Sequence, residues 1–310
     1  LPIILNTDGS KMGKRDRDKK IRHAAHLWMK NTKNTPSDLA AASSVERVTW
    51  WLEDDGRQLE NAEQQSVMKV IGLKNTDLPE ILVHDFRANG YLPESLLNFL
   101  ALLGWSPGGD RERMSVEEMV QLFAIDAIGR SNAKFNRDKL LAFNTEKLAS
   151  SSPEDLRAAL RDFLSANPAS PLHAASHDQL DRILKMNAGM HVLREVETKS
   201  AFLFADDDTL TWEPDAAEKV LLKNDRQGLN ALNAIAQLLA GLPQWTAAAI
   251  EETVKAYCQT TNLGLGKVAQ PIRVAVSGTT VSPPIFETLE FLGRDRALKR
   301  ISRCLAAYQK

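Results

Sequence analysis

The chain has 310 residues, of which 43% are hydrophobic and 25% charged, a composition typical of globular proteins with room for about two or three domains. Its 39 basic and 40 acidic residues cancel to a formal net charge of -1, which excludes a global positive field as the means of attracting nucleic acid. Cys258 and Cys304 form no CxxC pattern, and no apolar run approaches the length of a membrane span. We therefore expect a cytoplasmic protein without a disulfide framework or a thiolate zinc site.

The first residues predict a short strand that runs into a polar turn. The run from Leu1 to Leu5 is apolar, and Asn6 to Ser10 is dense in turn-forming residues. Because residue 1 is a leucine inside this apolar run, we expect the chain to be a fragment of a longer protein. Seven cations and two acids then follow between residues 11 and 22, which is the most basic stretch of the sequence.

Helix signals dominate the next part of the chain. Thr35 to Asp38 resembles a helix start, and Val45 to Leu59 is typical of an amphipathic helix. A buried helix is predicted from Pro93 to the residue before Gly104, with proline at its first turn and glycine just past its end. Two further helices are predicted to start at serine caps, Ser115 and Ser152.

After Ser152, apolar residues recur at steps of three and four residues, which is the period of a helix. The best alternating, strand-like pattern in this half is Ile272 to Val276. Because such patterns are rare here, we expect the C-terminal half to be a bundle of helices with short connections.

The segment from Asp8 to Arg15 carries the sharpest chemical signal. It is a glycine-containing loop with cations at Lys11, Lys14 and Arg15, suited to closing over a polyphosphate and neutralising its charge. A solvated basic turn is the plain alternative. The loop Lys11-Met12-Gly13-Lys14-Arg15 resembles the KMSKS loop of class I aminoacyl-tRNA synthetases, and Leu1 to Ser10 resembles its lead-in in glutamyl-tRNA synthetases.

This resemblance implies a catalytic role in binding ATP, with Lys14 on the phosphates, Lys11 and Arg15 assisting, and Met12 in the same nucleotide site. Gly13 stands where the family usually has serine. ATP with Mg²⁺ is the expected nucleotide, and the sequence offers no zinc site.

Two later blocks are similar to the same family. Asp85 to Trp105 resembles the stretch that follows the loop, and Ala269 to Glu287 resembles the anticodon-binding segment. Carried over by position, the second block implicates four anticodon-binding residues: Arg273, Ser282, Pro283 and Ile285. A guanidinium beside a kinked, apolar-lined loop suits unstacked bases. For Arg273 the alternative is a structural ion pair.

The resemblance implies a mainly α fold: the end of a class I catalytic region, a helical stem-contact domain and an all-helical anticodon-binding bundle. The expected domains are the loop region at residues 1–15, an insertion of unknown role and probable helical structure at 16–84, the stem-contact domain at 85–152 and the anticodon-binding domain at 153–310. Trp28, Trp50 and Trp51 of the insertion are expected in its core more than on bases. The histidine pairs His23/His26 and His173/His177 lack further ligands for zinc.

The resemblance further implies an ATP-dependent glutamate-tRNA ligase that acts on tRNA(Glu), with tRNA(Gln) as a second possible substrate, and that works as a monomer without a membrane. Because the glutamate pocket and the nucleotide-binding sheet lie outside these residues, we expect the isolated chain to be inactive in adenylation. Two alternatives stay open: a non-catalytic tRNA-binding module derived from such an enzyme, and a glutaminyl-tRNA synthetase, which would carry β-barrels in the C-terminal half.

Overall fold

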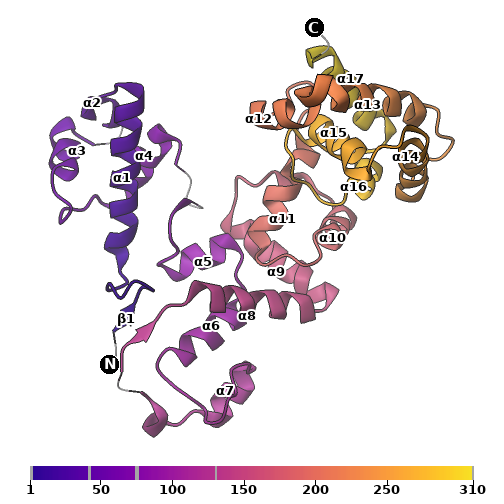
Figure 1. Ribbon diagram of the computed structural model, residues 1–310. Helices are drawn as coiled ribbons and strands as arrows, with labels where there is room; N and C mark the ends of the chain where they lie inside the picture. Colours follow the sequence, from indigo (N-terminus) through magenta and orange to yellow (C-terminus); the bar gives the residue numbers. More distant parts are fainter. Residues whose placement is uncertain (1–2, 41–42, 74–76, 130, 309–310) are drawn as a thin grey trace. The chain divides into compact units, whose positions relative to one another are not determined.

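The structure is a computed structural model that describes residues 3–40, 43–73, 77–129 and 131–308. The chain divides into two compact units, Leu1–Ser150 and Ser151–Lys310 (Figure 1). Both are built mainly from helices, as the sequence predicts, and the described strands are limited to one two-stranded sheet.

The first unit begins with strand β1 and four helices. Their bounds are Ile4–Leu5 for β1, Lys14–Thr32 for α1, Pro36–Leu39 for α2, Val45–Leu52 for α3 and Asn61–Ile71 for α4. Apolar residues at helical spacing on α1, α3 and α4 meet in one core, which includes Ile21, Trp51 and Val67. Residues 14–71 therefore have a hydrophobic core of their own.

A buried carboxylate organises this core. Asp18 is 1% exposed and accepts hydrogen bonds from Arg22 at 2.6 Å, from Trp51 Nε1 at 2.9 Å and from the Leu59 amide at 3.2 Å. A buried charge is tolerated when it is paired and its lone pairs are satisfied, and both conditions hold here. Trp51 is thus a core residue, whereas Trp50 lies at the surface against the guanidinium groups of Arg47 and Arg57.

The remainder of the first unit contains four α-helices, the 3₁₀ turn Ile125–Ala127 and strand β2. Their bounds are Val83–Asn89 for α5, Pro93–Leu102 for α6, Val116–Leu122 for α7, Ala133–Lys134 for β2 and Arg137–Ser150 for α8. A cluster of aromatic rings from α5, α6, β2's end and α8 forms the core, namely Phe86, Phe99, Phe135 and Phe143. β1 and β2 pair in parallel, with Ile4 opposite Ala133.

The second unit is made of helices alone in its described residues. The α-helices are α9 Pro153–Ala166, α10 His177–Met186, α11 Leu193–Ser200, α12 Pro214–Ala217, α13 Lys223–Ala240, α14 Ala247–Thr261, α15 Leu265–Ser277, α16 Ile285–Leu292 and α17 Arg294–Tyr308. Short 3₁₀ turns cover Pro171–Ala174 and Ala201–Phe204, and a π-helical turn covers Glu218–Leu222. Helices α13, α15 and α17 pack together at its core.

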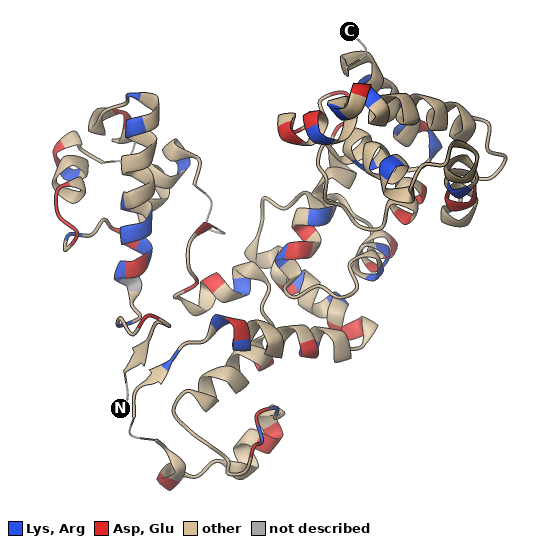
Figure 2. Ribbon diagram, viewed as in Figure 1, with Lys and Arg blue, Asp and Glu red and all other residues tan. Residues whose placement is uncertain are grey.

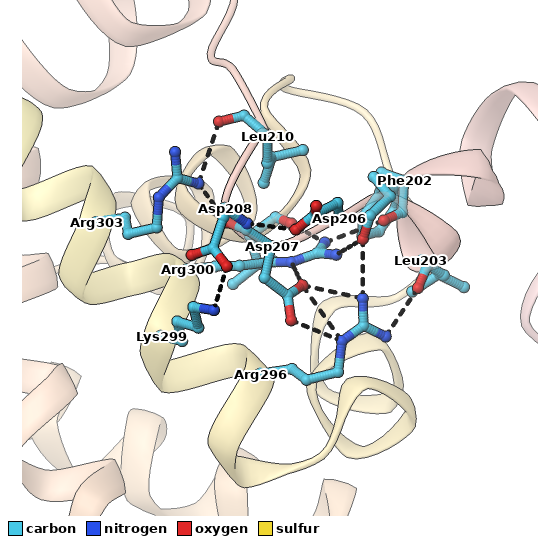
Figure 3. A network of polar contacts seen from close by, with 12 residues as sticks. Phe202, Leu203, Asp206, Asp207, Asp208, Leu210, Arg296, Lys299, Arg300 and Arg303 are labelled. Atoms are coloured by element: carbon cyan, nitrogen blue, oxygen red, sulfur yellow. Dashed lines mark hydrogen bonds and ion pairs between the residues drawn. The ribbon is translucent and has the colours of Figure 1, made fainter.

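A polar network joins α17 to the segment before α12 (Figure 3). Asp207 accepts hydrogen bonds from Arg296 Nε at 2.9 Å and from Arg300 Nε at 2.6 Å. Arg300 is 0% exposed and also donates to the backbone oxygens of Phe202, Ala205 and Val276. This one guanidinium therefore satisfies several buried carbonyls of segments far apart in the sequence.

One local prediction is wrong at its boundary, and one strand-like pattern of the sequence lies in a helix, as the predicted helical bundle requires. The helix expected from Val45 to Leu59 ends at Leu52, because Asp54 accepts a hydrogen bond from the Gly56 amide and turns the chain. The strand-like pattern of Ile272 to Val276 lies inside helix α15. Its β-branched residues are buried together with Val268 at helical spacing, so tertiary packing overrides the local alternation.

The predicted serine caps are confirmed. The Ser115 hydroxyl accepts from the Glu118 amide, and Glu118 accepts from the Ser115 amide, which is the predicted capping box. The Ser152 hydroxyl accepts from the Asp155 amide at the start of α9. Helix α6 begins at Pro93, as predicted.

Candidate functional site

The predicted nucleotide loop is a closed turn between β1 and α1. Asp8 accepts hydrogen bonds from the amide and the hydroxyl of Ser10, at 2.9 and 2.7 Å, and the hydrogen bonds lower the pKa of Asp8. Gly9 has a φ of +85°, a conformation that glycine adopts without strain. The Met12 amide then donates to the Ile4 oxygen at 3.1 Å, so the chain folds back along the strand before α1 begins.

Two of the three basic residues of this loop, Lys11 and Arg15, are exposed at the surface. Lys11 is exposed and forms an isolated antiparallel bridge with Leu5, and Arg15 is exposed in the first turn of α1. Met12 is half-buried against the aromatic core that contains Phe86. Lys14 begins α1, but its side chain lies outside the described part of the structure.

The helix end beside the loop is already capped. Asp16 Oδ2 accepts from the Gly13 amide at 3.1 Å and from Asn6 Nδ2 at 3.1 Å. Within the described residues, Lys11 and Arg15 form no ion pair. An anion at this loop would therefore meet free cationic side chains, while one donor of the helix end is occupied.

The predicted anticodon residues lie around the connection between α15 and α16. Arg273 Nε donates to the Ser282 hydroxyl at 2.9 Å, and that hydroxyl donates to the Pro283 oxygen at 2.7 Å. Gly278 ends α15 with a φ of +83°, and a Cβ there would lie 2.3 Å from the Thr211 oxygen. Only glycine fits this turn, which returns residues 279–284 toward Arg273.

The guanidinium group of Arg273 is not paired with a carboxylate in the described residues. In the part of the chain that the structure describes, it has no carboxylate within ion-pair distance, so the alternative of a structural ion pair finds no support. Burial lowers the pKa of Arg273, but an arginine stays protonated in proteins. Its two terminal nitrogens can therefore present a charged fork to a planar acceptor.

The apolar members of the predicted set are covered. Pro283 is buried and Ile285 is 5% exposed at the start of α16. Val281, which is not among the predicted residues, is an apolar side chain that this loop exposes, at 57%. No sequence signal distinguishes it, because its exposure depends on how the loop folds over α16.

The described residues hold neither a cluster of metal ligands nor a helix that could span a membrane. Among the described residues, no group of three or more His, Cys, Asp or Glu side chains is arranged to hold a metal ion. His173 Nε2 lies 3.2 Å from the Leu164 oxygen, so a backbone group is its neighbour. Over the same residues, every helix is too short or too polar to cross a bilayer.

Two family models match the chain. The model for the anticodon binding domain matches residues 155–305, and the model for the catalytic domain of class I tRNA synthetases (E and Q) matches residues 73–142. The first range contains Arg273 and the loop after α15. The basic loop at Lys11 to Arg15 and helices α1 to α4 lie outside both ranges.

Curated relatives and solved structures agree with these matches. Glutamate-tRNA ligase 2 of Coxiella burnetii (strain Dugway 5J108-111) is 38% identical over 231 residues, which are 73% of this chain and 46% of the relative. The glutamate-tRNA ligase of Rhodopseudomonas palustris (strain TIE-1) is 39% identical over 227 residues, 71% of this chain and 46% of the relative. A glutamate tRNA ligase from Elizabethkingia meningosepticum, solved with its amino acid, shares the fold with a TM-score of 0.59 at 23% identity, over 71% of this chain and 42% of that one.

The chain spans about half the length of the curated relatives it matches. It combines a match to an anticodon binding domain with a match to part of a class I catalytic domain, and the latter falls mostly on the range predicted as the stem-contact domain. The chain belongs to the glutamate-tRNA ligase family.

Proposed function

We propose that this chain forms part of an ATP-dependent ligase that joins glutamate to tRNA(Glu), and that its second unit reads the anticodon. The observation that carries the proposal is the Arg273–Ser282 pair, a guanidinium that a neighbouring hydroxyl orients and no described carboxylate neutralises, inside the range matched by the anticodon binding domain. Two further assignments, action on tRNA(Gln) and a monomer working in the cytoplasm, remain proposals of the same kind.

At the anticodon, Arg273 is proposed to read a base edge. The Ser282 hydroxyl accepts from Nε and fixes the guanidinium plane, which leaves the two terminal nitrogens to donate to adjacent acceptors of one base. The exposed Val281 side chain offers an apolar contact beside that fork. Pro283 and Ile285, which are buried, support the loop from beneath.

At the basic loop, Lys11, Lys14 and Arg15 are proposed to hold the phosphates of ATP. In adenylation the glutamate carboxylate attacks the α-phosphorus and pyrophosphate leaves, so negative charge grows on the leaving group, where cations stabilise it. Met12, held in the aromatic core, anchors the loop. The nearby carboxylates Asp8 and Asp16 are engaged in hydrogen bonds within the turn, so the Mg²⁺ that accompanies ATP would be held chiefly by the phosphates.

The remaining domain roles follow the same scheme. Residues 1–15 close the catalytic region, residues 16–84 form an insertion, residues 85–152 contact the tRNA stem and residues 153–310 bind the anticodon. The helical second unit supports a glutamate enzyme over a glutaminyl-tRNA synthetase, for which the sequence analysis expects β-barrels.

Binding of tRNAs with altered anticodons tests the proposal. We expect Arg273→Ala to weaken binding of tRNA(Glu) by about 1–3 kcal/mol, since a bidentate base contact contributes that much discrimination, and to weaken binding of tRNAs with a changed anticodon base far less. Filter binding with each tRNA measures both effects. Equal losses on every anticodon would show that Arg273 is a phosphate or structural contact and would reject the proposed role.

A control is Arg161→Ala, because Arg161 is an exposed arginine of the second unit that, like Arg273, has no described ion pair. Its loss should be the same for all anticodons. A second measurement addresses the non-catalytic alternative: ATP–pyrophosphate exchange by the isolated chain with glutamate is expected at background. Turnover above background would show that the chain activates glutamate alone.

A further inference from the structure

Helix α1 carries a continuous basic stripe on the face that points away from its core. Its five members follow one another at steps of four, four, three and four residues, which keeps them on one side of a helix: Arg15, Lys19, His23, His26 and Lys30. All five are exposed, and Lys20 lies beside them. The stripe extends roughly 22 Å along the helix axis at 1.5 Å per residue. Figure 2 shows basic residues in blue along α1.

The opposite face of α1 packs against the hydrophobic core of residues 14–71. Ile21 and Ala25 are 0% exposed, and two cations of the helix, Arg17 and Arg22, are buried with acids. Arg17 pairs with Asp85 at 2.8 Å, and Arg22 pairs with the buried Asp18 at 2.6 Å. The helix therefore divides its cations into a paired, buried set and an exposed set.

The exposed cations of the stripe have no carboxylate partner among the described residues. Arg15, Lys19 and Lys30 form no ion pair there. Of the two acids on α1, Asp18 is buried and Asp16 is held by Asn6 and the Gly13 amide. His26 Nε2 lies 3.3 Å from the Leu52 oxygen, so this histidine also contacts the backbone at the end of α3.

Unpaired arginine and lysine side chains distributed over this length, with the two histidines as additional polar groups between them, fit a polyanion with regularly spaced charges. Each strand of a nucleic-acid helix offers a phosphate about every 3.4 Å of its axis, so 22 Å spans several of them. A membrane surface fits less well, because a helix that lies in a bilayer needs a free apolar face, and that of α1 is buried against Trp51 and Val67.

We propose that the basic stripe of α1 binds the phosphate backbone of a helical part of tRNA. This proposal rests on the proposed function and extends it to a segment that neither family model covers, since residues 14–71 precede both matched ranges. The contact is independent of sequence, because it is made to phosphates, and it adds affinity to the anticodon contacts without changing which anticodon is preferred.

The test compares two double variants of the chain in tRNA binding at several salt concentrations. Lys19→Gln/Lys30→Gln removes two stripe charges. Lys69→Gln/Lys134→Gln removes two charges from exposed lysines of the same unit that lack a described ion pair and lie outside the stripe. Neither pair belongs to the predicted ATP or anticodon residues. Circular dichroism and thermal midpoints confirm that each variant is folded.

We expect Lys19→Gln/Lys30→Gln to bind tRNA about tenfold more weakly at low salt, by the same factor for every anticodon. The plot of log K against log salt should become less steep, its slope being smaller in magnitude by about 1.8, or 0.9 per lost phosphate contact. The Lys69/Lys134 control should bind like the parent chain. Equal binding by parent and stripe variant would overturn the inference. If Arg273→Ala in that case still weakens binding of tRNA(Glu) much more than binding of tRNAs with a changed anticodon base, the proposed function survives.

A vesicle-binding experiment distinguishes RNA from a membrane surface as the partner of the stripe. Vesicles of phosphatidylserine and phosphatidylcholine are mixed with the same proteins. Loss of vesicle binding in the stripe variant together with unchanged tRNA binding would overturn the RNA proposal in favour of a membrane surface. Failure of the parent chain to bind any tRNA would overturn both this inference and the proposed function.

Discussion

Helices α1 and α17 are both rich in lysine and arginine, yet most of the cations on α17 are paired while a whole face of α1 carries unpaired ones. On α17, Arg296 and Arg300 bind Asp207, Lys299 binds Asp208, and Arg303 donates to backbone oxygens. On α1, the exposed cations of the basic stripe have no described ion pair. The comparison shows that the density of basic residues does not determine their role; the acids and carbonyls that face them do.

Arg296, Arg300 and Arg303 of α17 are tied to a segment about ninety positions earlier in the chain, and their contacts there are partly or fully buried. Such contacts stabilise the fold but leave nothing for a ligand. The α1 stripe contributes little to the fold, and its charges stay available. If this contrast is right, substitutions in the two groups should affect stability very differently.

The largest effect is expected at Asp207. Asp207→Ala leaves the guanidinium of Arg300 buried without a carboxylate, and breaking a buried pair in this way costs about 3–5 kcal/mol. Denaturation followed by hydrogen exchange in residues 151–310 measures the loss of free energy of unfolding in that unit.

Asp208→Ala is the matched control for this experiment. Asp208 is the next residue and also pairs with a cation of α17, but the pair with Lys299 is solvent-exposed and should contribute at most about 1 kcal/mol. Losses of similar size in the two variants would contradict the view that burial gives the Asp207 pairs their importance.

Acid should weaken the same network. Burial by itself would raise the pKa of Asp207, but the hydrogen bonds and charges of Arg296 and Arg300 outweigh it and hold the pKa below its ordinary value of 3.8. Because the pKa is lower in the folded than in the unfolded chain, this contribution is complete above the ordinary value and is lost as pH falls below about 4. Unfolding of the second unit between pH 7 and pH 3 measures the loss.

The Asp207→Ala variant serves as the reference in that titration. The difference in free energy of unfolding between parent and variant should shrink as the pH falls, because the carboxylate that the variant lacks becomes protonated in the parent. A difference that stays constant down to pH 3 would mean that Asp207 stabilises the unit through its shape and neutral hydrogen bonds.

Local features of the fold could be predicted from the sequence. The caps at Ser115 and Ser152 depend on residues three positions apart, and the helix from Pro93 is set by proline and glycine at its ends. The family blocks also identified Arg273 and Ser282, which the structure joins by a hydrogen bond. Their role in reading a base stays a prediction.

Features that depend on distant pairing could not be predicted. The sequence gives no reason to connect Asp207 with Arg300, which are 93 residues apart, or Asp18 with Trp51, which are 33 apart. For the same reason the basic run at residues 11–22 looked uniform, although Arg17 and Arg22 are buried in ion pairs and Lys19 is exposed. The net charge of -1 does not distinguish the buried, paired cations from the exposed ones.

The smallest effect is expected in the stripe itself. Lys19→Gln/Lys30→Gln should change the free energy of unfolding by no more than about 0.5 kcal/mol, because exposed side chains without partners contribute little to a fold. Hydrogen exchange in residues 14–71 checks this in the variant used for tRNA binding. A loss above about 1 kcal/mol would show that these lysines have a structural partner. The contrast between α1 and α17 would then fail, and weaker tRNA binding by the variant would reflect damage to the fold.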